Sequence, residues 1–242
     1  MSDQPLIEVT IAAPYKTVWS ALRDPKLLAR WFGWDAESLE EEIKFIFEGG
    51  ATADEAKGVV QFGEWEGKVD RFEVEDRGDH TVVRMVRAGE APDGGWDSVF
   101  DDVVQGWIAF VEQLRFAVER QGLAARRTVF LSGEPKEGGM LARQALRLES
   151  GAPEGPTGAL SGSTWARHTH QESAEITDWG PGLLLAMDQP AGGKRPRGVS
   201  SLILTTYSFD DARFAAFEQA WNSWWTERYI PLKPPSNEPP AA

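Results

Sequence analysis

The side chains best suited to bind a metal ion in this sequence are His168, His170 and Glu172. Residues two apart in a β-strand point to the same face of the sheet, so a strand over residues 164–177 would bring all three together. Imidazole nitrogen and carboxylate oxygen atoms can hold zinc or nickel. The same alternation is also typical of a polar strand face in contact with solvent. We therefore predict no metal site and no cofactor, and keep His168 and His170 as weak metal-ligand candidates.

Acidic residues offer a second kind of chemistry, general acid–base catalysis. The candidates are Glu37, Glu40, Glu41, Glu42, Asp101 and Asp102. Carboxylates near the start of a helix are usually solvated and are favoured there by the positive end of the helix dipole. Asp101 and Asp102 also lie off the apolar stripe of the long helix predicted around them, so we expect their pKa values to be unshifted.

Sequence motifs of other enzyme classes are absent. The chain has no nucleophile elbow, phosphate-binding loop or dinucleotide-binding fingerprint. It also has no cysteine, which excludes disulfides, thiolate zinc sites and cysteine nucleophiles. No catalytic residue is predicted.

The chain is strongly acidic, with a formal net charge of −13 and a pI near 4.8. Proteins that grip nucleic acid by its phosphates need a basic face, and anionic membranes attract basic segments. The basic cluster of Lys194, Arg195 and Arg197 lies among glycine and proline, so it is expected in a solvated loop. We predict no nucleic-acid partner and no membrane partner.

No segment of the sequence predicts membrane insertion or export. No apolar run approaches the ~20 residues that a spanning helix needs. The first residues, Met-Ser-Asp-Gln-Pro, lack the basic and then apolar layout of a signal peptide. The absence of cysteine is compatible with a reducing compartment. We therefore predict a cytoplasmic protein.

The first half of the chain predicts a strand, two short helices, a series of strands and a long helix. Alternating apolar residues predict strands over residues 6–11, 42–47, 58–62, 67–74 and 80–86. Pro14 and Pro25 are placed to begin the two short helices. A broad apolar stripe at helical spacing predicts the long helix from about Trp96 to Arg120, and Gly122 is suited to its left-handed C-terminal cap.

The second half repeats this order. Strands are predicted over residues 128–131, 164–177, 183–187 and 199–207, a short helix over 139–148, and a loop over 149–163. The last helix is predicted over residues 210–228, with Ser208 as its N-cap. The shared order indicates two tandem copies: a first domain over 1–122, a degenerate second copy over 123–230, and a disordered Pro-rich tail over 231–242.

Several short motifs of the first half resemble one known family. They are Ala13-Pro14, Val18-Trp19, Ala21-Leu22, Asp24-Pro25, Leu27, Trp31-Phe32, Gly67-Lys68-Val69 and Gly106-Trp107 with Phe110 and Leu114. This pattern resembles the START-like (SRPBCC) superfamily, in the branch related to the activator of the heat-shock-protein-90 ATPase. The resemblance covers about residues 5–121 and is most specific at its opening.

The resemblance implies an α+β helix-grip fold, in which an antiparallel sheet curls around a long C-terminal helix and leaves an apolar cavity between them. Family domains usually have six strands between the short helices and the long helix, whereas about four are predicted here. We therefore expect two tandem shortened copies, and the short sheet puts a full-sized cavity in doubt.

Aromatic residues would line that cavity, in a chain with 11 Trp, 12 Phe and 3 Tyr. The cavity-lining candidates are Trp31, Phe32, Phe47, Phe62, Trp65, Met85 and Trp107. Apolar walls suit hydrophobic small molecules, but the same rings could instead simply fill the space. We predict a non-enzymatic protein that holds a hydrophobic small molecule. The alternatives are a co-chaperone-like or regulatory protein-interaction module, which would bind a protein partner, and a cyclase- or hydratase-type enzyme.

Overall fold

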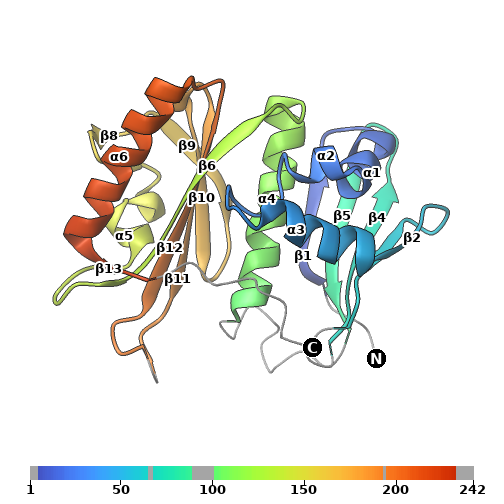
Figure 1. Ribbon diagram of the computed structural model, residues 1–242, viewed down its shortest axis with the longest axis horizontal. Helices are drawn as coiled ribbons and strands as arrows, with labels where there is room; N and C mark the ends of the chain where they lie inside the picture. Colours follow the sequence, from blue (N-terminus) through green and yellow to red (C-terminus); the bar gives the residue numbers. More distant parts are fainter. Residues whose placement is uncertain (1–4, 65–67, 89–100, 193–194, 233–242) are drawn as a thin grey trace. The chain divides into compact units, whose positions relative to one another are not determined.

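The computed structural model describes residues 5–64, 68–88, 101–192 and 195–232 (Figure 1). The chain divides into two units, Met1–Ala124 and Ala125–Ala242. Each unit holds an antiparallel sheet and a long helix near its C-terminal end. The predicted α+β class, with tandem copies of a helix-grip arrangement, is confirmed.

The first unit follows the predicted order. Its elements are β1 (Pro5–Ile11), α1 (Tyr15–Arg23), α2 (Pro25–Leu28), α3 (Leu39–Ile43), a π-helix (Lys44–Gly49), β2 (Thr52–Asp54), β3 (Val59–Gln61), β4 (Asp70–Asp76), β5 (Thr81–Arg87) and α4 (Asp102–Gln121). The five strands form one sheet in the order β1-β5-β4-β3-β2, and every neighbouring pair is antiparallel.

The long helix α4 covers this sheet with one apolar stripe. Val104, Ile108, Val111 and Leu114 lie in the core together with residues of β1, β4 and β5. The spacing of three and four residues places these side chains on one helix face. Gly122 caps the helix in the left-handed conformation, at φ 54°, as predicted. The predicted start near Trp96 lies outside the described residues.

The prediction of a strand over residues 42–47 is wrong, because this segment is helical. Ile43 and Phe47 are buried, whereas Phe45 is exposed. Apolar residues at positions i and i+4 fit a helix as well as they fit alternation in a strand. The glutamates before them are good helix formers, and Lys44 pairs with Glu40 at 2.7 Å across one turn. Local helix propensity and this charge pair favour the helix.

The second unit holds a six-stranded antiparallel sheet in the order β13-β6-β12-β11-β10-β9. Its elements are β6 (Arg126–Pro135), α5 (Ala142–Ala145), a short 3₁₀ helix (Leu148–Ser150), β7 (Glu154–Gly155), β8 (Gly158–Ala159), β9 (Gly162–Arg167), β10 (Gln171–Ile176), a second 3₁₀ helix (Thr177–Trp179), β11 (Gly182–Gln189), β12 (Val199–Tyr207), α6 (Asp211–Arg228) and β13 (Tyr229–Pro231).

Four sequence predictions for this unit need correction. The strand predicted over 164–177 is a hairpin of two strands, β9 and β10, and only four residues of the helix predicted over 139–148 form α5. The N-cap of α6 is Asp210, which accepts a hydrogen bond from the Arg213 N–H at 2.8 Å, and not Ser208. Pro231, predicted to begin a disordered tail, still pairs with Gly133 in the sheet. Residues 233–242 lie outside the described part.

Aromatic rings fasten α6 to its sheet. Trp225 stacks on Tyr229 with ring centroids 3.9 Å apart, and its indole N–H donates to the backbone oxygen of Ser132. A β-carbon at Gly133 would lie 3.0 Å from the Trp225 indole nitrogen, so this glycine permits the close approach of the helix. The helix and sheet of the second unit therefore meet through rings in direct contact.

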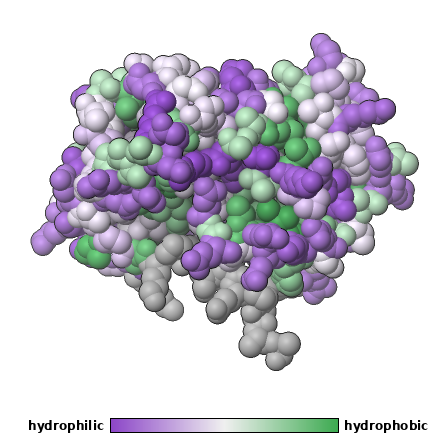
Figure 2. All heavy atoms as spheres, turned by 45° about the horizontal axis from the view of Figure 1, so that its top comes forward, coloured by the Kyte–Doolittle hydropathy of each residue, from purple (hydrophilic) through white to green (hydrophobic). Residues whose placement is uncertain are grey.

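The surface agrees with the acidic, polar composition. On the face shown in Figure 2, hydrophilic side chains surround separate hydrophobic patches. Large hydrophobic side chains that are exposed among the described residues include Phe45, Val103, Met140 and Ile230. No helix in the described part of the chain is long and apolar enough to cross a membrane.

Candidate functional site

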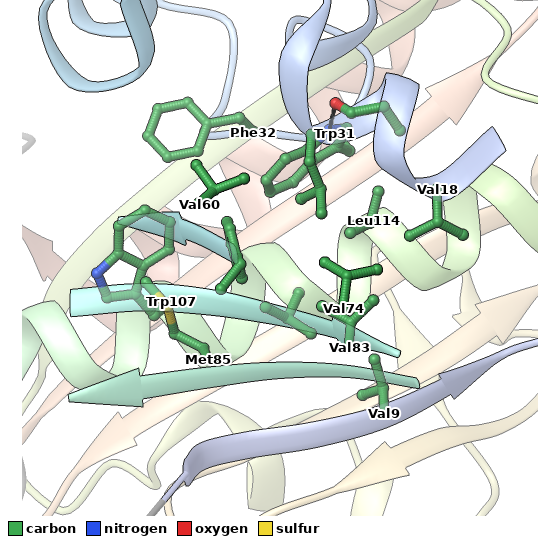
Figure 3. Packing of buried hydrophobic residues seen from close by; sticks show 14 of the residues in the cluster. Val9, Val18, Trp31, Phe32, Val60, Val74, Val83, Met85, Trp107 and Leu114 are labelled. Atoms are coloured by element: carbon green, nitrogen blue, oxygen red, sulfur yellow. Dashed lines mark hydrogen bonds between the residues drawn. The ribbon is translucent and has the colours of Figure 1, made fainter. Parts of the chain in front are cut away.

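Six of the predicted cavity-lining residues lie in one core cluster of the first unit, and Figure 3 labels Trp31, Phe32, Met85 and Trp107 among them. Trp31 and Phe32 follow α2, Phe47 lies on the π-helix, Phe62 follows β3 and Trp107 lies on α4. We define the ring cluster as Trp31, Phe32, Phe47, Phe62, Phe72 and Trp107. Met85, on β5, packs in the same core opposite Phe72, and Trp65 lies outside the described residues.

The rings of this cluster touch one another in sequence. Centroids are 4.9 Å apart for Phe32 and Phe47, 5.3 Å for Phe47 and Phe62, and 5.0 Å for Phe62 and Trp107. The first two pairs meet edge to face, which is a favoured geometry for aromatic pairs. Every ring is buried, so the chain's own side chains occupy the space between these elements. A ligand at this position would have to displace one of them.

Phe72 belongs to the cluster although sequence reasoning did not select it. It lies in register opposite Val60 on β3 and Met85 on β5. Its ring is 5.6 Å from that of Trp107. Phe72 and Val74 are two residues apart in the predicted strand 67–74. This spacing predicts that both side chains lie on the same, inner face of the sheet.

The two cluster tryptophans place their indole N–H groups differently. The Trp31 N–H donates to the backbone oxygen of Ala21 at 2.9 Å, inside the core. The Trp107 N–H donates to Oδ2 of Asp70 at 3.1 Å. In Figure 3 the Trp107 nitrogen lies on the side of the ring away from the other labelled side chains. Trp107 therefore links the ring cluster to a charged group.

That charged group is a buried ion pair between neighbouring strands. Asp70 begins β4 and lies directly opposite Arg87, which ends β5. The guanidinium donates to both carboxylate oxygens, from Nε at 2.8 Å and from a terminal nitrogen at 2.9 Å. The Arg87 side chain is 2% exposed and the Asp70 side chain 13%. Sequence reasoning selected neither residue.

A second carboxylate lies beside this pair. Asp101 caps α4 by accepting the N–H groups of Val103 and Val104, both at 3.0 Å. One of its oxygens is 3.7 Å from Arg87 and the other is 3.6 Å from Lys68. We use the name polar anchor for Asp70, Arg87, Asp101 and Lys68 together with the Trp107 N–H.

The pKa values of the polar anchor follow from burial and its opposing charges. Burial acts to lower the pKa of Arg87, but the hydrogen bonds and negative charges of Asp70 and Asp101 outweigh it and raise that pKa. Burial acts to raise the pKa of Asp101, but the capping N–H groups and the charges of Arg87 and Lys68 lower it. The expectation of an unshifted pKa for Asp101 is wrong, because the residue is the N-cap and not a solvated position within the helix.

The ring cluster includes one residue on an irregular helix. Phe47 lies on the π-helix Lys44–Gly49, followed directly by Gly50. π-Helices are rare and are frequently found at functional sites. A β-carbon at Gly50 would lie 2.9 Å from the backbone oxygen of Phe45, so the chain can turn this tightly only with glycine there. Phe47 is therefore the cluster ring that a π-helix positions.

The predicted metal-ligand candidates do not share a strand. His168 and His170 lie in the turn between β9 and β10, and His170 is buried there. Glu172 is on β10 and pairs with Arg167 at 2.6 Å. Within the part of the chain that the structure describes, no group of three histidine, aspartate or glutamate side chains is placed to hold a metal ion.

The acidic run before the π-helix makes local contacts. Glu40 pairs with Lys44, which lowers the pKa of Glu40 through their hydrogen bond and the lysine charge. Glu42 accepts a hydrogen bond from Ser38. These contacts lie within one helical segment and support its structure.

The second unit holds a buried carboxylate in a structural position. Asp188, on β11, accepts the backbone N–H groups of Ala142 and Arg143 at 3.0 and 3.1 Å. It also accepts the Ser200 hydroxyl at 2.7 Å and the Arg143 Nε–H at 3.1 Å. These bonds cap the short helix α5 and fasten it to the sheet.

A groove of about 330 Å³ lies beside the C-terminal end of α6. Its lining residues are Lys136, Glu137, Gly138, Gly139, Met140, Ala145, Glu227, Arg228 and Tyr229. Lys136 and Arg228 each donate to a backbone oxygen in the last turns of α6, at 2.8 and 3.0 Å. Both side chains therefore cap backbone oxygens at the C-terminal end of α6.

No known family model matches the chain, and no curated protein matches it. Among solved structures, DynU16 from the dynemicin biosynthetic locus is similar at 15% identity, covering 91% of this chain and 94% of its own, with a TM-score of 0.28. The di-domain ARO/CYC BexL from the BE-7585A biosynthetic pathway is similar at 11% identity over 92% and 94%, with a TM-score of 0.36. Protein MLL2253 from Mesorhizobium loti is similar at 20% identity over 48% of this chain and 97% of its own, with a TM-score of 0.32.

TM-scores below 0.5 give no basis for transferring a function. The relation to the ATPase activator, which rests on motifs of the first half, stays a prediction. The function has to be inferred from the residues of this chain.

Proposed function

We propose that the first unit binds a hydrophobic small molecule at the ring cluster, and that Phe47 gives way to it. The observation that carries this proposal is the set of six buried rings from separate elements, one of them held by a π-helix beside paired glycines. Apolar walls with a few placed polar groups are what small-molecule sites provide. The polar anchor supplies such groups at Trp107.

Displacement of Phe47 explains how a cluster that is filled by the chain's own rings can still bind a ligand. Phe47 touches Phe32, Phe62 and Trp107, so its ring lies at the centre of the cluster. Moving one phenylalanine ring leaves an apolar space bounded by rings, and such spaces bind small aromatic molecules.

The experiment compares the full chain with two matched variants. Native mass spectrometry detects any molecule that purifies with the protein, and the fluorescence of Nile red measures binding of an apolar probe. Phe47→Ala opens the cluster, while Phe214→Ala removes a buried phenylalanine from the core of the second unit. We expect Phe47→Ala to bind Nile red at least about tenfold more tightly than Phe214→Ala, since several rings surround Phe47, whereas Phe214 lies between the Phe217 ring and the Arg127 guanidinium.

Equal probe binding by both folded variants, together with no co-purified molecule, contradicts the proposal. That result would favour the protein-interaction alternative, which needs no interior site. Conversion of a bound molecule on prolonged incubation, followed by the same mass measurement, would favour the cyclase- or hydratase-type alternative.

A further inference from the structure

Two phenylalanines of one helical segment in the first unit face in different directions. Helix α3 continues directly into the π-helix, so residues 39–49 form a single segment (Figure 1). Phe47 is 1% exposed and lies in the ring cluster, whereas Phe45 is 54% exposed. In the described part of the chain, the Phe45 ring contacts no other aromatic ring and no cation. The outer side of this segment therefore presents a ring that the packing of the first unit does not use.

Carboxylates flank this exposed ring along the chain. Residues 35–55 carry eight acidic side chains and only Lys44 as a basic one, and Lys44 is already paired with a glutamate at 2.7 Å. Glu41 lies four residues before Phe45, so both side chains project from the same side of the helix. Glu48 follows three residues after the ring. Both glutamates are exposed, and neither forms an ion pair with another described residue.

The charge of this surface limits what can cover it. Nucleic acid and anionic lipid headgroups are repelled by carboxylates. A second copy docked through the same surface about a two-fold axis would bring like charges face to face, which is costly. A wholly apolar partner would take Glu41 and Glu48 out of water without giving them a partner. A positively charged partner meets none of these costs.

An arginine side chain matches the ring and the carboxylates at once. Its guanidinium group is planar, stacks on aromatic faces and pairs with a carboxylate through two parallel hydrogen bonds. The ammonium group of lysine is a compact charge that is strongly hydrated, so it gains less from an exposed ring. The combination of ring and carboxylate therefore favours arginine over lysine.

We propose that the surface formed by Glu41, Phe45 and Glu48 binds an arginine-bearing basic segment of a partner protein. We call this surface the docking face. An arginine of the partner stacks on the Phe45 ring, and a flanking glutamate accepts its hydrogen bonds. The docking face lies on the outer side of the helical segment, so this proposal does not depend on a ligand at the ring cluster.

Fluorescence anisotropy with labelled peptides tests the proposal on the full chain. The probes are fluorescein-labelled Arg-Gly-Arg-Gly-Arg and Lys-Gly-Lys-Gly-Lys, both amidated at the C-terminus, which carry the same charge. Stacking of a cation on an exposed ring favours the arginine peptide, so we expect it to bind about two- to fivefold more tightly than the lysine peptide. The affinity of both peptides should fall as salt is added, because exposed charges are screened.

Two pairs of variants assign the binding to the docking face. Phe45→Ala should remove the difference between the peptides, whereas Met140→Ala, at a side chain of equal exposure in the second unit, should keep it. Glu41→Gln should weaken binding of both peptides at least about twofold. Its control is Glu137→Gln, at another exposed glutamate that forms no ion pair within the described residues, and it should change little.

Several results would overturn the proposal. Equal affinity of the natural chain for the two peptides, or a difference that survives Phe45→Ala, contradicts stacking on this ring. Equal losses for Glu41→Gln and Glu137→Gln would show that the acidic chain attracts cations without a defined site. Sedimentation velocity and flotation with phosphatidylcholine vesicles test other occupants. A dimer or a vesicle-bound state that Phe45→Ala abolishes would assign the surface to a second copy or to lipid.

Discussion

Asp70 and Arg87 are direct cross-strand partners at the ends of β4 and β5, and the guanidinium of Arg87 donates to both oxygens of Asp70. Bidentate pairs of this kind fix geometry as well as charge. The pair orients Oδ2 of Asp70 towards the indole N–H of Trp107. The position of the Trp107 ring in the cluster therefore depends on an ion pair between two strands.

Replacing Trp107 by phenylalanine should destabilise the chain more than the same replacement of Trp31. Trp107 loses a hydrogen bond to a charged carboxylate, which contributes about 1.5–3 kcal/mol, whereas Trp31 loses one to a neutral carbonyl, about 1 kcal/mol. Both replacements remove similar ring volume. Urea unfolding of the two variants measures the difference. A larger loss for Trp31→Phe would show that the bond to Asp70 contributes little.

Acid should weaken the first unit partly through Asp101. Because its pKa is lowered in the folded state, the ionised carboxylate contributes stability above its unfolded pKa of about 3.9, and this contribution is lost as the pH falls through the lower folded value. Asp101→Asn should therefore lower the melting temperature at pH 7 more than at pH 2. Asp210→Asn, at the N-cap of α6, is the control for loss of a capping carboxylate. An equal decrease at both pH values for Asp101→Asn would contradict the assignment.

The tyrosines should resist ionisation in the folded protein. Burial is the main cause that raises the pKa of all three, Tyr15, Tyr207 and Tyr229, and the pKa of Tyr207 rises to about 12. The folded state then holds more protons than the unfolded state above pH ~10, so stability falls as the pH rises through that range. Tyrosinate absorbance near 295 nm should stay low at pH 10.5 and increase on addition of urea. Full ionisation at pH 10.5 without unfolding would be inconsistent with buried hydroxyl groups.

Asp188 should be among the most costly residues to remove from the second unit. Asp188→Ala removes the acceptor of the Arg143 backbone N–H and of the Arg143 Nε–H, and leaves the Ala142 N–H with the Ser200 hydroxyl oxygen alone. We therefore expect a loss of about 3–5 kcal/mol in the free energy of unfolding. Ser200→Ala removes one donor to that carboxylate and one of the two acceptors of the Ala142 N–H, which Asp188 still accepts, and should cost about 1–2 kcal/mol. Chemical denaturation of both variants checks the order. A cost for Asp188→Ala no larger than that for Ser200→Ala would show that its backbone bonds contribute little.

The sequence predicts most of the strands and both long helices, because each repeats its apolar residues at one clear period. Where the apolar residues fit both the period of a strand and that of a helix, local interactions decide. The segment around Phe45 forms a helix although its apolar residues alternate with others. A turn within a polar run leaves no apolar signal, so the position of His168 and His170 in a turn, off the strand that carries Glu172, could not be predicted.

The ring cluster and the polar anchor differ in how far they could be predicted. Apolar rings at strand and helix positions point to a shared core, and five of the selected rings lie together. Asp70 and Arg87 are 17 residues apart, and only the register of β4 on β5 makes them partners. A shift of that register by one residue would turn their side chains to other neighbours.

The π-helix Lys44–Gly49 has a consequence for how this chain can change by insertion and deletion. Its hydrogen bonds join residues five apart, so each turn holds one residue more than an α-helical turn. Deleting one residue between Ile43 and Phe47 would restore α-helical spacing, and residues three apart in an α-helix share one face. Phe47 would then stay on the buried face of Ile43, whereas the same deletion in an α-helix would rotate the following side chains by about 100° around the helix axis. We therefore expect this segment to tolerate the loss of one residue while the core of the first unit keeps its ring.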